Sequence, residues 1–93
     1  MAVVHCKKAK FDVYIGRPSK WGNPFEIGVH GNRQEVITMY KAWLWKQLKS
    51  NAITNEEILE LDGKVLGCWC APQACHGDVL IAAINYLKEN KNA

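Results

Sequence analysis

One short segment of the chain, CWCAPQACH, gathers thiol and imidazole side chains that could hold a metal ion. Cysteine sulfur and histidine nitrogen are the usual protein ligands of Zn²⁺, although Cys-x-Cys is a tighter spacing than the common Cys-x-x-Cys. On an extended strand, residues 68 and 70 point to the same face, so their two sulfurs can reach one ion. Zinc is therefore one candidate, with the ligands Cys68, Cys70, Cys75 and His76.

Cys75 also suits covalent chemistry. A helix beginning near residue 75 would stabilise a thiolate at its N-terminus. In that interpretation Cys75 is the nucleophile and the neighbouring His76 is the general acid or base. Asp78, in the first turn, is expected to cap backbone amides or to hydrogen-bond an imidazole, and it is also counted among the ligand-binding residues. A third interpretation treats the cysteines as small buried hydrophobic residues, and all three stay open here.

A second segment, GRPSKWGNPF, has the residue types that suit a phosphate joined to a ring. Arginine and lysine supply positive charge, glycines let backbone amides approach a ligand, and aromatic side chains offer flat faces. The segment does not match the Walker phosphate loop. The alternative is a proline-braced surface loop whose aromatic residues cover the core. The residues assigned to ligand binding here are Gly16, Arg17, Lys20, Trp21, Gly22 and Asn23.

Two residues outside this loop complete the candidate ligand site. Arg33 opens a predicted helix, whose positive N-terminal end would help it bind the same anion. Trp69 lies between two of the cysteines, and either it or Trp21 could stack on a ring.

The elements that must position these residues alternate in type. Short β-branched or aromatic runs predict strands at 2–6, 11–15 and 64–68. Apolar residues at helical spacing after the N-cap Asn32 predict a helix at 33–50, and similar signals predict a short helix from Thr54 to before Gly63 and a final helix at 75–90. Residues 16–32, rich in glycine and proline, form a long loop.

This alternation predicts a small single-domain α/β fold over residues 1–93, in which a sheet and helices form two or three layers. The sheet is expected to be at least partly parallel. In such sheets ligands bind beyond the carboxyl ends of parallel strands. Both unusual segments, 16–25 and 68–76, follow predicted strand ends. We therefore expect them to share one pocket.

Composition narrows the function class. The chain has 93 residues, a formal net charge of +3 and four cysteines. This is too short for a multidomain enzyme, and its mild charge does not favour nucleic acid as the partner. No membrane span or signal peptide is predicted, so we expect a cytoplasmic protein with its cysteines as thiols. Trp45, at the edge of the apolar face of the long helix, suggests a homo-oligomer contact.

The two segments together carry a resemblance. The strings VYIGRPSKWGNPF and LDGKVLGCWCAPQACHGDVL, with an arginine opening the helix between them, closely resemble the bacteriophage and bacterial family called domain of unknown function 4326. The resemblance implies a phage-associated or bacterial cytoplasmic protein and joins the two loops in one signature, but it names no reaction. The signature positions fall on Gly16, Arg17, Trp21, Gly22, Asn23, Pro24, Phe25, Arg33, Cys68, Cys70, Pro72, Cys75 and His76, with Asp78 nearby.

The leading expectation is a pocket that binds a phosphorylated nucleotide or nucleoside-like ligand, with group transfer or hydrolysis as the reaction class if the protein is an enzyme. One alternative is a protein that sequesters a nucleotide signal without turnover. The other is a zinc-stabilised module that contacts nucleic acid or protein.

Overall fold

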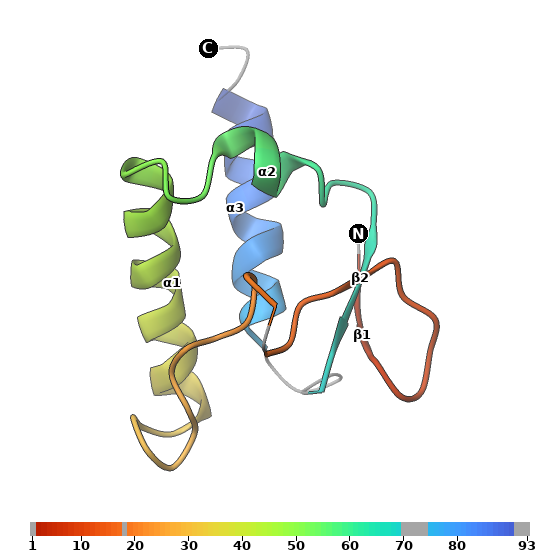
Figure 1. Cartoon of the computed structure of the whole chain (residues 1–93), viewed down its shortest axis with the longest axis vertical. Helices are drawn as coiled ribbons and strands as arrows, with labels where there is room; N and C mark the ends of the chain where they lie inside the picture. The colour runs from red at the N-terminus through yellow and green to blue at the C-terminus, as the bar shows by residue number, and fades with distance from the viewer. Residues whose placement is uncertain (1, 18, 70–74, 91–93) are drawn as a thin grey trace.

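The computed structural model describes residues 2–17, 19–69 and 75–90, and Figure 1 shows how its elements are arranged. Its sheet contains β1 (Ala2–His5), β2 (Val13–Tyr14) and β3 (Val65–Cys68) in the order β1-β3-β2. Both neighbouring pairs are parallel. The structure therefore confirms the predicted α/β class and makes the described sheet parallel throughout.

The strands are shorter than the sequence predicted, although the flanking backbone still contacts the sheet. Asp12, predicted as part of the second strand, donates its amide to the carbonyl of Val65 at 2.7 Å and accepts the Val65 amide with its side chain at 2.7 Å. After β2, the amide of Ile15 donates to the carbonyl of Gly67 at 2.9 Å. The carboxylate of Asp12 thus accepts an amide of β3 that a longer β2 would bind through a backbone carbonyl.

Helix α1 (Arg33–Lys49) begins where the N-cap signal predicted. The side chain of Asn32 accepts the amide of Glu35, and the carboxylate of Glu35 accepts the amide of Asn32. This reciprocal capping box satisfies two amides that the first helical turn leaves unpaired. The buried residues of α1 recur at helical spacing and face the core: Val36, Tyr40, Leu44 and Leu48.

Helix α2 (Asn55–Leu59) has a second capping box, made by Thr54 and Glu57, and buries Ile58. Helix α3 (His76–Asn90) follows β3 and places Leu80 and Ile84 in the core. In Figure 1, α3 lies between α1 and the strands, and α2 lies beside its C-terminal half. No helix in the described part of the chain is long and apolar enough to cross a membrane.

Gly77 lets the first turn of α3 approach the sheet. A Cβ atom at this position would lie 2.7 Å from a methyl carbon of Val3 and 2.9 Å from the terminal carbon of Ile15. Both distances are shorter than carbon atoms tolerate. The missing side chain therefore allows the N-terminus of α3 to sit against β1 and the end of β2.

Candidate functional site

One cavity of about 380 Å³ lies beyond the carboxyl end of the sheet. Because β2 and β3 are parallel, the segments that follow them leave the sheet at the same edge. The structure thus brings the two segments singled out in the sequence together, and α1 closes the cavity from the side. The lining residues are Gly16, Arg17, Asn23, Phe25, Glu26, Ile27, Arg33, Val36, Ile37, Cys68, Trp69, Cys75 and His76.

Cys75 lies at the floor of this cavity, immediately before α3. It is 2% exposed, and its sulfur accepts the amide of Gly77 at 3.5 Å. The amide of Cys75 donates in turn to the carboxylate of Asp78 at 3.2 Å. Asp78 therefore caps backbone, one of the roles expected for it, and it does not line the cavity. The helix N-terminus and the Gly77 amide both favour negative charge on the sulfur.

His76 is buried beside Cys75, and its tautomer is fixed by a backbone carbonyl. Its Nε2 lies 2.7 Å from the carbonyl oxygen of Ile15, which can only accept, so Nε2 carries a proton. In the neutral ring, Nδ1 is then an acceptor, and it lies 3.4 Å from the sulfur of Cys75. The site thus contains a thiol and imidazole pair in which the acceptor nitrogen Nδ1 is the ring nitrogen beside the sulfur.

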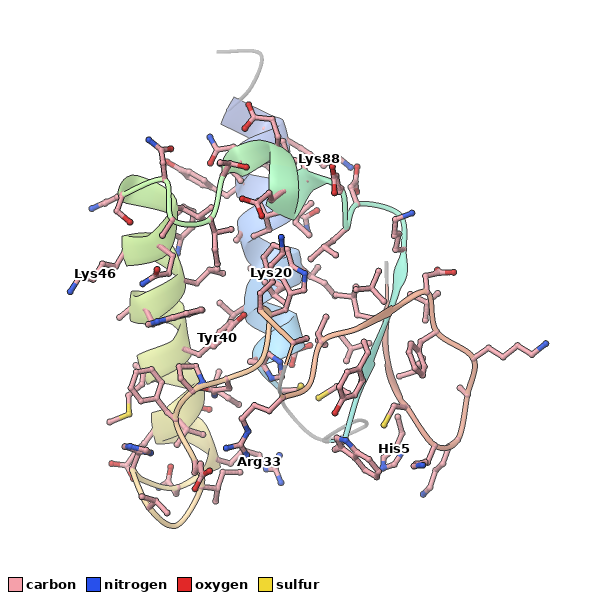
Figure 2. The ribbon with its side chains drawn as sticks, viewed as in Figure 1. His5, Lys20, Arg33, Tyr40, Lys46 and Lys88 are labelled. Carbon is pink, nitrogen blue, oxygen red and sulfur yellow. The ribbon has the colours of Figure 1, made fainter. Side chains whose placement is uncertain are left out.

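Tyr40 supports the floor from α1. Its ring meets that of His76 edge to face, with centroids 5.0 Å apart. Its hydroxyl donates to the carbonyl of Trp21 at 2.8 Å. Burial raises the pKa of Tyr40 above its ordinary value, and negative charge on Cys75 raises it further. Tyr40 therefore stays a neutral donor that ties the 16–25 loop to α1; Figure 2 shows it between α1 and α3.

The two tryptophans assigned to stacking have different environments. Trp21 is 5% exposed, belongs to the core and does not line the cavity, so the structure does not bring it to the site. Trp69 lines the cavity and is 54% exposed. Its indole nitrogen donates to the hydroxyl of Tyr14 at 2.8 Å, and that hydroxyl donates to the carbonyl of Arg17 at 3.1 Å. Trp69 therefore combines an exposed side chain with a fixed position, and the ammonium of Lys7 lies over its ring, 5.5 Å from the centroid.

The cationic residues also separate. Arg17 and Arg33 line the cavity, and Arg17 forms an ion pair with Glu26 at 2.6 Å. Lys20, also assigned to the anion, instead pairs with Glu57 of α2, and its ammonium lies over the ring of Trp21. In Figure 2 Lys20 lies away from Arg33, which stands near the start of α1. Lys20 does not belong to the cavity lining.

The remaining loop residues shape the rim. Asn23 lines the cavity, donates its side-chain amide to the carbonyl of Val36 at 3.1 Å and accepts the amide of Phe25 at 2.9 Å. Gly16 also lines the cavity. Gly22 does not, and a Cβ there would lie 3.0 Å from the backbone of Arg17. Gly22 thus packs against the loop backbone, and Asn23 holds the loop in place while it also lines the cavity.

The floor contains three donor atoms that suit a metal. The ligand atoms of Cys68, Cys75 and His76 all lie within 4.8 Å of one another, and all three residues are buried. Cys70, the fourth ligand of the predicted set, lies outside the described residues. The same atoms could therefore serve as metal ligands or as a nucleophile with its base.

The sequence interpretation missed part of this site. Glu26 follows the 16–25 loop directly, yet a charged loop residue gives no sequence signal that it will pair with Arg17. Tyr40 lies within the predicted helix 33–50, but its contact with His76 depends on how α1 meets α3. The carbonyl of Ile15 is backbone, which no residue-type pattern marks.

Comparison with known proteins agrees with the resemblance seen in the motifs. No solved structure matches the chain. An uncharacterised 12.4 kDa protein encoded in the nrdA-td intergenic region of Enterobacteria phage T4 is 38% identical over 86 residues, which cover 91% of this chain and 78% of the phage protein. Residues 4–86, which include both pocket segments, match the family described as a domain of unknown function, DUF4326, and the chain belongs to that family.

Proposed function

We propose that the cavity binds a phosphorylated nucleotide or a similar nucleoside-like molecule. The observation that carries this proposal is the presence, in one cavity, of two arginines and an exposed tryptophan side chain that a hydrogen bond holds in place. The cavity volume of about 380 Å³ falls within the range of small-molecule sites. Enclosed cavities with a few convergent polar groups are the usual form of such sites.

The phosphate end of the ligand would lie between Arg17 and Arg33. A guanidinium has five N–H donors in a planar fork, so Arg17 can contact a phosphate while it keeps its bond to Glu26. Two arginines against one glutamate leave the lining side chains with a net positive charge. Arg33 is the first residue of α1, where the helix dipole also favours an anion.

The ring of the ligand would stack on Trp69. Any nucleic-acid base can stack on an aromatic side chain, because every base has a π face. The hydrogen bond from Trp69 to Tyr14 fixes the indole before the ligand arrives, so little side-chain freedom is lost on binding. Binding alone, as in a protein that sequesters a nucleotide signal, requires nothing more than these contacts.

The test is calorimetric titration of the purified protein with nucleoside monophosphates and diphosphates, and with the unphosphorylated nucleosides. Arg33→Ala should weaken phosphate-dependent binding by about tenfold or more, because a charged hydrogen bond contributes about 1.5–3 kcal/mol. Lys46→Ala is the matched control, since Lys46 lies on the exposed side of the same helix, away from the cavity. Binding that is equal for nucleosides and nucleotides, or unaffected by Arg33→Ala, would contradict the proposal.

A further inference from the structure

We infer that Cys68, Cys75 and His76 form a zinc site at the floor of the cavity. Two thiolates and one imidazole are a donor set that Zn²⁺ prefers. The three ligand atoms already lie within 4.8 Å of one another, although Cys68 ends β3, Cys75 immediately precedes α3 and His76 begins it. This inference concerns the floor alone and stands whether or not the rim binds a nucleotide.

The distance between Cys75 and His76 fits one shared metal. With Zn–S near 2.3 Å and Zn–N near 2.0–2.1 Å, a tetrahedral angle places sulfur and nitrogen about 3.5 Å apart. The sulfur of Cys75 and Nδ1 of His76 are 3.4 Å apart. This pair is therefore at the separation that a shared ion requires, and the sulfur of Cys68 lies within 4.8 Å of both atoms.

The surroundings of the ligands match those of metal-binding residues. A histidine that binds metal through one nitrogen usually donates its other N–H to a carbonyl or carboxylate. Nε2 of His76 donates to the carbonyl of Ile15, which leaves Nδ1 for the ion. The amide of Gly77 donates to the sulfur of Cys75, a contact that stabilises a thiolate. The fold has thus oriented both ligands of α3 through backbone groups.

Burial favours a metal over a nucleophilic cysteine. Reactive cysteines are usually partly exposed, whereas Cys68 and Cys75 are 1% and 2% exposed. A nucleophile with its base needs only Cys75 and His76 and leaves Cys68 without a role. Two thiolates bound to Zn²⁺ form a neutral group, which removes most of the cost of burying their charge.

The zinc site would connect the sheet to α3, and the bound ion would be accessible from the cavity. All three ligands line the cavity, so the fourth position of a tetrahedral ion points to water or to a ligand bound there, unless the chain supplies it. Three protein ligands with a fourth open position are the arrangement of catalytic zinc sites, where the ion activates water or polarises an oxygen atom.

The first test measures metal in the intact protein. Protein purified without chelator and incubated with Zn²⁺ should retain about one equivalent after desalting, as expected for a single tetrahedral site. Co²⁺ should bind in its place and give the absorption bands of tetrahedral cobalt together with sulfur-to-cobalt charge transfer. Protein that stays metal-free, or that binds Co²⁺ without a thiolate band, would overturn the inference and leave Cys75 as a nucleophile or as a buried hydrophobic residue.

A second test locates the metal. Cys68→Ser should weaken Co²⁺ binding by at least about tenfold and reduce the charge-transfer band, because one of two thiolates is lost. Cys6→Ser is the control, since Cys6 also follows a strand end but is not one of the three clustered donors. Loss of the band in Cys6→Ser with retention in Cys68→Ser would place the metal elsewhere. If Cys68→Ser does not fold, the wild-type cobalt spectrum still decides.

Discussion

The rim and the floor of the cavity hold their polar groups in opposite environments. At the rim, Arg17 and Glu26 pair with about half of each side chain exposed. At the floor, Cys75 and His76 are almost fully buried, and backbone groups contact both of them: the amide of Gly77 donates to the sulfur of Cys75, and Nε2 of His76 lies 2.7 Å from the carbonyl of Ile15. Salt screens the interaction between exposed charges, whereas the positions of buried polar groups depend on the packing around them. Rim and floor should therefore respond to different perturbations.

Stability should fall most when the packing under the floor is disturbed. Gly77→Val places a branched side chain where a Cβ alone would lie 2.7 Å from Val3. Overpacking of this kind costs about 1–3 kcal/mol, which corresponds to a loss of about 4–8 °C in melting temperature per kcal/mol. Thermal unfolding measured by circular dichroism would report it.

The matched control for that substitution is Asn85→Val, which adds the same side chain at an exposed position of the same helix. This substitution should change the free energy of unfolding by at most about 1 kcal/mol, the range of helix propensities. Equal losses for the two variants would mean that Gly77 does not set the distance between α3 and the sheet.

A smaller loss is expected when the support of Tyr40 is removed. Tyr40→Phe leaves the carbonyl of Trp21 without this donor, which costs about 1–2 kcal/mol. The phenol of Tyr40 also makes the stability of the folded protein depend on pH. Its pKa is raised in the folded protein, so the folded state binds the proton more tightly, and this part of the stability is complete below the unfolded pKa of about 10 and lost as pH rises above it.

Stability curves at neutral and alkaline pH would test both parts. Tyr40→Phe should melt below the wild type at pH 7 and lose less stability than the wild type above pH 10, whereas Tyr86→Phe, on the exposed side of α3, should follow the wild type. A wild-type protein whose stability rises through the same alkaline range would contradict the buried neutral phenol.

How much of this could be predicted from the sequence depends on the distance over which each signal acts. The caps at Asn32 and Thr54 and the buried stripe of α1 are local patterns, and all appear in the structure, as do the three strands, although these are shorter than predicted. The shared pocket followed from the parallel topology. The exposure of Trp69 and the burial of Trp21 did not, because two tryptophans in similar loops differ only through tertiary packing. Likewise, Lys20 meets a partner 37 residues away and His76 meets a carbonyl 61 residues away.

A smaller difference, in nucleotide affinity, is expected between substitutions of two cationic residues of the same loop. Arg17→Ala should weaken nucleotide binding by about tenfold, whereas Lys20→Ala should leave the affinity unchanged, because Lys20 faces Glu57 and does not line the cavity. Calorimetry on both variants measures the difference. A loss of affinity in Lys20→Ala equal to that in Arg17→Ala would extend the anion site beyond the rim described above.

The most direct test of a single pocket is a nuclear magnetic resonance titration of the isotope-labelled protein with a nucleoside monophosphate. We expect the signals of the backbone amide of Arg17, the indole N–H of Trp69 and the amide of His76 to shift together and to saturate with one dissociation constant. Assignment of the indole signal follows from its loss in Trp69→Phe. Shifts confined to one of the two loops, or absent from both, would contradict the pocket that joins them.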